Sequence, residues 1–213
     1  ARGSYFMHPR GWAIQGRTLI AESLYQAWFH RNRLRKPSIL KYILRRFTSP
    51  VREISNPICL YYGSKNYYHF YNDIVFSIST LSDLGVLKDR PVLVPAELGK
   101  TSYFLEAIKQ SPLLKSVQFE FQNDFEIIRV SNPIFCFPAW GRPQNIIVAA
   151  ERIFESQACC NRVNISEYIY VTRKDSVRSA SNESDICSAL QDRGFDVVDC
   201  GRMSLEEQRK TFC

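Results

Sequence analysis

The chain has 213 residues, 45% of them hydrophobic and 13% aromatic, and its formal net charge is +7 at pH 7. This length and composition fit one domain, or one and a half, with a packed apolar core, and they exclude a disordered chain. No run approaches the roughly 18 to 20 apolar residues of a membrane span.

The seven cysteines are odd in number and follow no zinc-ligand spacing, which favours reduced thiols. We therefore expect a cytoplasmic location. Asn164 and Asn182 each begin an Asn-x-Ser triplet that would permit glycosylation, so the lumen of the secretory pathway stays the alternative.

The positive charge is concentrated near the amino end. After a predicted strand or hairpin over residues 12–23, eight lysines and arginines and no acidic residue lie in the stretch from Arg31 to Arg52. Within this stretch, apolar residues at helical spacing predict an amphipathic helix over residues 38–47. Its basic face could meet a membrane surface, an acidic partner or nucleic acid, or simply face solvent. Few aromatic residues accompany the charges, so nucleic acid is unlikely.

The rest of the first half alternates short apolar runs with longer periodic ones, which is typical of an α/β fold. The predicted strands cover residues 58–62, 91–95, 117–121, 126–130 and 134–137, and the predicted helices cover 67–84, with Gly85 as its stop, and 101–110. A further helix over 144–156 is expected to link two units. We thus divide the chain into an α/β lobe (1–143), a linker (144–166) and a second, partial Rossmann-like lobe (167–213).

The second lobe has a clear pattern. A strand over 167–172, a helix over 182–193, Gly194 and a strand over 195–199 predict a βαβ unit with parallel strands. Ser204 and Glu207 have the spacing of a capping box, which predicts a helix over 205–212. Two strands are too few to stand alone, so this unit either leans on the first lobe or belongs to something larger.

His69 and Asp73 are the first candidate functional residues. They lie four residues apart at the start of the helix over 67–84, a spacing that brings both onto one face. The carboxylate can then hold the imidazole and raise its basicity, so that the histidine serves as a general base. The alternative is a half-buried histidine with Asp73 as an ordinary hydrogen-bond partner.

The second candidate is the loop over 172–183, which follows a parallel strand and precedes a helix. Arg173, Lys174 and Arg178, together with the N–H groups of the helix start, could bind a phosphate or diphosphate. The alternative is a solvated loop. Glycine-rich nucleotide motifs, a P-loop, zinc-protease, hydrolase and kinase signatures, and Asp-x-Asp are all absent. We therefore expect no metal site and a metal-independent reaction.

These segments resemble a known family. The residues concerned are Asn66-Tyr67-Tyr68-His69-Phe70 with Asp73, then Tyr170-Val171-Thr172-Arg173, Arg178, Asn182-Glu183, Leu190, Gly194-Phe195, Leu205 and Glu207-Gln208. In this order they resemble the family 61 glycosyltransferases over residues 12–212. The resemblance implies a two-lobed GT-B enzyme that transfers a sugar from a nucleotide-sugar donor, with inversion and without a cofactor. Related proteins build capsular or cell-wall polysaccharide or modify secreted glycoproteins.

The resemblance also implies roles for particular residues. His69 and Asp73 would line the acceptor side, with one of them as the base. Arg173, Arg178, Asn182 and Glu183 would bind the donor, the arginines replacing a metal at its diphosphate, and Asn66 would also bind substrate. The family pattern continues with a strand and a His-Gly-Ala loop that this chain does not contain. We therefore expect a C-terminally truncated, incomplete GT-B arrangement that could be inactive.

The rival hypothesis is a non-catalytic α/β module. It would dock on an acidic partner, a membrane surface or nucleic acid through the basic stretch from Arg31 to Arg52. Such binding would weaken steeply as the salt concentration rises and would survive replacement of His69 and Asp73 by alanine.

Overall fold

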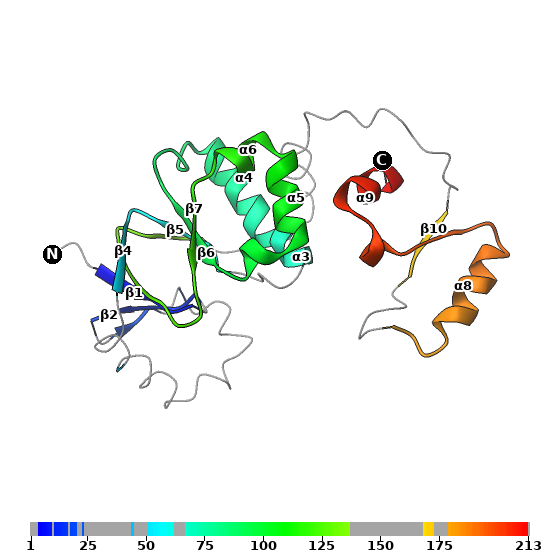
Figure 1. Ribbon diagram of the computed structural model, residues 1–213, viewed down its shortest axis with the longest axis horizontal. Helices are drawn as coiled ribbons and strands as arrows, with labels where there is room; N and C mark the ends of the chain where they lie inside the picture. Colours follow the sequence, from blue (N-terminus) through cyan, green and yellow to red (C-terminus); the bar gives the residue numbers. More distant parts are fainter. Residues whose placement is uncertain are drawn as a thin grey trace. The chain divides into compact units, whose positions relative to one another are not determined.

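The structure is a computed structural model that describes residues 4–9, 11–16, 18–20, 23, 44, 51–61, 67–136, 168–172 and 179–212. The chain forms two compact units, Ala1–Glu155 and Ser156–Cys213 (Figure 1). Parallel strands and helices alternate in both, which confirms the α/β class. No helix in the described part of the chain has the length and apolar character needed to cross a bilayer.

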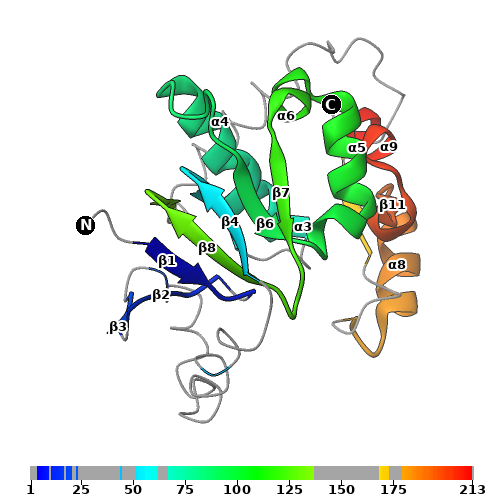
Figure 2. The same cartoon turned by 60° about the vertical axis from the view of Figure 1, so that its left-hand side comes forward.

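The first unit contains two sheets. Its strands are β1 (Ser4–Met7), β2 (Ala13–Gln15), β3 (Thr18–Leu19), β4 (Val51–Ser55), β5 (Ile58–Cys59), β6 (Val92–Pro95), β7 (Phe119–Gln122), β8 (Ile127–Ser131) and β9 (Ile134–Phe135). A mixed sheet has the order β3-β2-β1-β8-β4, antiparallel except for the parallel pair β4 and β8 (Figure 2). A parallel sheet has the order β7-β6-β5-β9.

Two matching segments connect these sheets. The sequence Ser-Asn-Pro-Ile occurs at 55–58, between β4 and β5, and again at 131–134, between β8 and β9. The two copies run side by side, with Ser55 opposite Ser131 in the mixed sheet and Ile58 opposite Ile134 in the parallel sheet.

The two asparagines of these segments turn the chain from one sheet into the other. Asn56 and Asn132 have φ angles of 54° and 47°, in the left-handed region that asparagine tolerates better than most residues. The following prolines have no N–H to continue the ladder. Arg90 spans the pair, since its Nη1 donates to the carbonyl oxygens of both asparagines at 3.2 and 3.5 Å.

The core of the first unit covers both faces of the parallel sheet, and a separate buried cluster of Trp12, Ile14 and Ile127 packs at the mixed sheet. Between the two sheets pack Met7, Ala13, Ile54, Cys59, Tyr61, Leu93, Ile128 and Val130. Side chains alternate along a strand, so Ile58, Leu60, Val92 and Val94 lie on the opposite face, where they are fully buried. The helices cover that face (Figure 1). Each such aliphatic side chain contributes about 1.5–3 kcal/mol on burial.

One helical segment follows β5 in the chain and carries His69 and Asp73. It consists of α3 (Tyr67–His69), a π-helical stretch η3 (Phe70–Val75) and α4 (Phe76–Asp83). The continuous helix predicted over 67–84 is confirmed, and Gly85 ends it with a φ of 67°. The sequence did not predict that the middle of this helix is π-helical.

The remaining helices of the first unit lie between β6 and β7. They are the short η4 (Leu98–Lys100), α5 (Ser102–Gln110) and α6 (Pro112–Ser116). The prediction of a helix over 101–110 is confirmed. Pro112, just beyond the end of α5, starts α6, because a proline fits the first helical turn and the Ser111 hydroxyl accepts a hydrogen bond from the Leu114 N–H.

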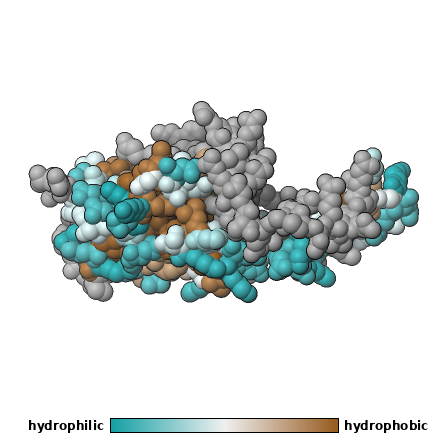
Figure 3. All heavy atoms as spheres, turned by 90° about the horizontal axis from the view of Figure 1, so that it is seen from above, coloured by the Kyte–Doolittle hydropathy of each residue, from teal (hydrophilic) through white to brown (hydrophobic). Residues whose placement is uncertain are grey.

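Some large apolar side chains of the first unit are exposed at its surface. Figure 3 shows apolar residues gathered on one face of it, bordered by hydrophilic ones. Leu84 and Leu105 are among its exposed large hydrophobic residues, at 69% and 56% exposure. Leu44, one of the apolar residues of the predicted helix over 38–47, is helical and is 58% exposed.

The second unit contains the predicted βαβ motif. Strands β10 (Ile169–Val171) and β11 (Asp196–Val198) pair in parallel, and α8 (Glu183–Gln191) lies between them in the chain. Gly194, with a φ of 84°, ends the turn after α8. After η5 (Cys200–Arg202) comes α9 (Leu205–Phe212). The capping box is confirmed, since Ser204 N–H donates to Glu207 at 2.7 Å and Glu207 N–H to Ser204 Oγ at 3.2 Å.

Several predictions differ from the structure or lie outside its described residues. The hairpin over 12–23 is confirmed as β2 and β3, whereas strands β1 and β4 were not predicted. Strand β5 ends at Cys59 and β9 at Phe135, two or three residues earlier than predicted. The helix over 144–156 and most of the basic stretch lie outside the described residues.

Candidate active site

The order of the parallel sheet indicates where a ligand would bind. In chain order its strands are third, second, first and fourth, so the direction of winding reverses between β5 and β9. The chain goes from β5 to β7 through the helices but reaches β9 through β8 of the mixed sheet. In open α/β sheets, ligands bind beyond the carboxyl ends of the strands at such a switch point. Here β5 is followed by Leu60 and Tyr61, and β9 by Cys136.

His69 and Asp73 lie on the helix that follows β5, and the contact predicted between them is confirmed. His69 Nδ1 is 2.8 Å from Asp73 Oδ2. The histidine side chain is 34% exposed and the aspartate side chain 2%. An ionised carboxylate only accepts hydrogen bonds, so Nδ1 carries the hydrogen and Nε2 is the nitrogen that can act as a base.

Asn72 adds a second polar contact to the buried carboxylate. Its side-chain amide donates to Asp73 Oδ1, and the residue is only 5% exposed. Burial raises the pKa of Asp73 above its ordinary value, although the hydrogen bonds from His69 and Asn72 act in the opposite direction. The sequence prediction of the site did not include Asn72.

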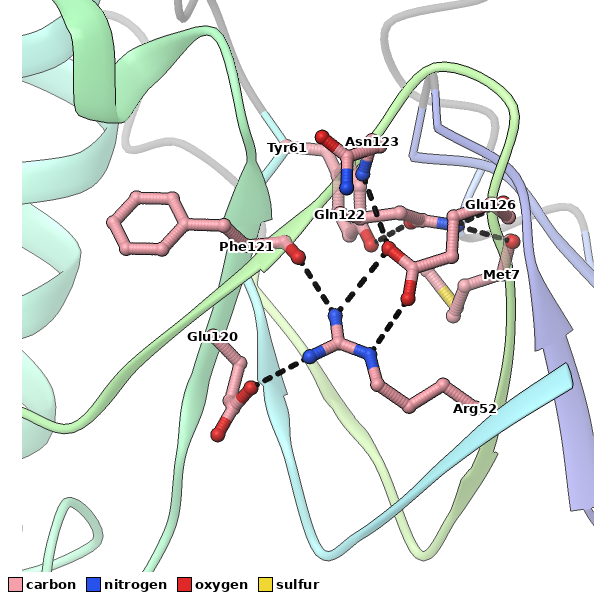
Figure 4. A network of polar contacts seen from close by, with 8 residues as sticks. All are labelled: Met7, Arg52, Tyr61, Glu120, Phe121, Gln122, Asn123 and Glu126. Carbon is pink, nitrogen blue, oxygen red and sulfur yellow. Dashed lines mark hydrogen bonds and ion pairs between the residues drawn. The ribbon is translucent and has the colours of Figure 1, made fainter.

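Tyr61 holds the chain in place where it leaves β5. Its hydroxyl donates to the side-chain oxygen of Gln122, at the end of β7. The Gln122 amide in turn donates to the carbonyl oxygens of Met7 and Glu126, at 2.9 and 3.0 Å (Figure 4). Gly11 packs on the tyrosine so closely that a Cβ on this glycine would come within 2.4 Å of Tyr61 Cβ.

Arg52 belongs to the same network. Its guanidinium contacts Glu120 at 2.8 Å, the Phe121 carbonyl oxygen at 2.6 Å and Glu126 at 2.7 Å (Figure 4). It thereby ties β4 to β7 and to the turn that follows β7. Arg52 ends the basic stretch that begins at Arg31, and the carboxylates of Glu120 and Glu126 pair with its charge.

Three tyrosines gather beside the start of the helix. The ring of Tyr67 is 4.9 Å from that of Tyr71 and 5.8 Å from that of Tyr103, measured between centroids. Burial raises the pKa of Tyr71 and of Tyr103, so both phenols stay protonated. Tyr67 is 42% exposed and offers an amphipathic surface two residues from His69.

In the second unit, the structure describes Glu183 but not the arginines of the loop over 172–183. The Glu183 carboxylate, 6% exposed, accepts hydrogen bonds from Thr172 Oγ1 at 2.7 Å and from the Tyr170 hydroxyl at 3.1 Å. It thus joins the end of β10 to the start of α8. Asn182 precedes α8, is exposed, and makes no side-chain cap.

The other predicted site residues cannot be placed. Asn66, Arg173 and Arg178 lie outside the described residues. Within the part of the chain that the structure describes, no group of three or more histidine, cysteine, aspartate or glutamate side chains is arranged to hold a metal ion.

A comparison with known families identifies the chain. A family model described as Glycosyltransferase 61 matches residues 67–213, which is most of the sequence. The chain belongs to the glycosyltransferase 61 family. The match in this glycosyltransferase begins at the first residue of the helix that carries His69 and Asp73, and it includes the whole βαβ motif. Neither a search of curated proteins nor a search of solved structures found a match.

Proposed function

We propose that this family 61 glycosyltransferase transfers a sugar from a nucleotide-sugar donor to a hydroxyl group of a glycan or glycoprotein, with inversion and without a metal ion. The observation that carries the proposal is the contact between His69 and Asp73 on the helix that follows β5, beside the switch point of the parallel sheet. The match to the family supports the reaction class.

His69 is the general base in this proposal. Asp73 is 2% exposed, whereas the imidazole is 34% exposed, so the histidine is the better placed of the two to reach an acceptor. Nε2 takes the proton of the acceptor hydroxyl while its oxygen attacks the anomeric carbon. The new C–O bond forms as the bond to the nucleoside diphosphate breaks on the opposite side, which inverts the anomeric configuration. Asp73 stabilises the imidazolium that results.

The donor side belongs to the second unit, in a GT-B arrangement. Arg173 and Arg178 neutralise the departing diphosphate in place of a metal, because guanidinium groups bind phosphate oxygens in a bidentate manner. Asn182 and Glu183 complete this side, and Asn66 contributes from the acceptor side. The contact of Glu183 with Thr172 supports its part, since it fixes the residue just before the loop that holds both arginines.

The direct test measures sugar transfer and donor hydrolysis by the full-length protein with a panel of nucleotide sugars. We expect His69→Ala to lower kcat by about 10²- to 10⁴-fold, the contribution of a general base. His8→Ala is the matched control, because His8 stacks on Trp12 and takes no part in the contact between His69 and Asp73. Transfer that persists in His69→Ala at the wild-type rate would refute the role of His69, and an absence of donor binding would refute the proposed reaction.

A further inference from the structure

We propose that Asn72 is a positioning residue for the reaction: its side-chain amide fixes the orientation of the Asp73 carboxylate, and through it the orientation of the His69 imidazole. This inference rests on the proposed function. It assigns to Asn72 a role beyond that of a buried polar residue in a helix.

The two oxygens of the Asp73 carboxylate have different partners. Oδ1 accepts from the Asn72 amide, and Oδ2 lies 2.8 Å from His69 Nδ1. Rotation about the last side-chain bond of an aspartate is only weakly restricted. A donor on the first oxygen removes this freedom, so the second oxygen stays directed at the imidazole.

The contact between Asn72 and Asp73 is buried, so its loss would be unfavourable. Asn72 is 5% exposed and Asp73 2%. Loss of the amide would leave a desolvated carboxylate oxygen without that donor, and a buried acceptor without a partner is strongly unfavourable. The hydrogen bond from Asn72 also opposes the effect of burial on the pKa of Asp73, and so helps to keep the ionised form that the histidine requires.

The π-helical turn explains how the side chains of two consecutive residues, Asn72 and Asp73, come into contact. On a regular α-helix, side chains at positions i and i+1 do not face each other. Asn72 and Asp73 lie within the π-helical stretch Phe70–Val75, where hydrogen bonds run from i to i+5 and the turn is wider. Such single turns occur frequently at functional sites. The local backbone therefore suits the polar contact better than an uninterrupted α-helix would.

The first experiment compares the kinetics of Asn72→Ala and Ser77→Ala in the full-length protein. Ser77 is a matched control, because it is 6% exposed and donates to the backbone oxygen of Asp73, not to its carboxylate. We expect Asn72→Ala to lower kcat about tenfold, a part of what a general base contributes, while KM stays within about twofold. This drop in kcat with little change in KM is what a residue that positions the base should give. Ser77→Ala should keep the wild-type kcat and KM.

The second experiment observes His69 directly, without activity. The chain has only three histidines, so nitrogen-15 NMR of histidine-labelled protein resolves them, and His69→Gln assigns the signal. We expect the Nδ1–H tautomer in the wild type and in Ser77→Ala, and a mixture of tautomers in Asn72→Ala. An unchanged His69 tautomer together with an unchanged kcat in Asn72→Ala would overturn the inference. If His69→Gln retained full activity, the proposed function would fail, while the NMR result would still decide the role of Asn72.

Discussion

The hydroxyl of Tyr61 and the side-chain oxygen of Gln122 join the carboxyl ends of β5 and β7 by a buried hydrogen bond. These residues lie 61 positions apart in the chain. Because Tyr61 comes two residues after the end of β5, this bond fixes the chain where it leaves the strand on its way to His69.

We expect Tyr61→Phe to fold and to lose about 1 kcal/mol of the free energy of unfolding, or somewhat more, because it leaves the Gln122 oxygen without its donor. Urea unfolding measures this difference. The double variant Tyr61→Phe with Gln122→Leu should lose less than the sum of the two single variants, which a double-mutant cycle detects. Strict additivity would show that the two side chains are not coupled.

Gly11 offers a test of the close contact with Tyr61. A methyl group there would meet Tyr61 Cβ at 2.4 Å, and the residue has a φ of 86°. Gly16 has a φ of 60° and nothing within 4 Å of such a methyl group, so Gly16→Ala carries only the backbone cost of about 1–2 kcal/mol. We expect Gly11→Ala to lower the free energy of unfolding by about 1–3 kcal/mol more than Gly16→Ala does. Equal losses would contradict the contact.

Asp73 should reduce stability at neutral pH. Burial raises the pKa of its carboxyl group in the folded protein, so between the unfolded and folded pKa values the folded state binds more protons than the unfolded state. Stability therefore falls as the pH rises through this window. We expect Asp73→Asn to raise the melting temperature at pH 7, and the gain to vanish at a pH below the unfolded pKa. Asp124 is exposed, so Asp124→Asn is the control. A lower melting temperature for Asp73→Asn at pH 7 would contradict this prediction.

We expect Glu183 to support binding of the nucleotide-sugar donor through its contact with Thr172. We expect Glu183→Ala to weaken donor binding severalfold and to destabilise the protein by about 1–3 kcal/mol, because the hydroxyl groups of Thr172 and Tyr170 lose a buried acceptor. Glu183→Gln keeps an acceptor oxygen and should lose less in both measurements. Calorimetric titration with the nucleotide sugar and thermal unfolding measure the two effects. Asp185→Ala, at an exposed residue two positions further on, should change neither.

Local sequence patterns predicted those parts of the fold that local interactions determine. The helix from Tyr67 to Gly85 and the βαβ motif of the second unit follow from apolar periodicity and from glycines with positive φ. Strand β4 was missed because its partner β8 lies far along the chain, and β1, which was also missed, pairs with β8 as well as with β2. The repeated Ser-Asn-Pro-Ile was the signal that could have revealed β4 and its pairing.

The same distinction applies to the candidate site. The contact of His69 with Asp73 depends on a spacing of four residues and was predictable. The contact of Asn72 with Asp73 was not, since α-helical geometry separates neighbouring side chains and the π-helical turn leaves no mark in the apolar pattern. Tyr61 was missed because its partner Gln122 comes from another strand.

The paired Ser-Asn-Pro-Ile segments limit how this family member can vary in length. Both copies cross from one sheet to the other in register, and Asn132 Nδ2 lies 3.3 Å from Asn56 Oδ1. One extra residue in either copy would shift its strand by one position and turn the apolar side chains of β5 or β9 to the opposite face. Insertions and deletions in the two segments should therefore be tolerated only together, although 76 positions separate them.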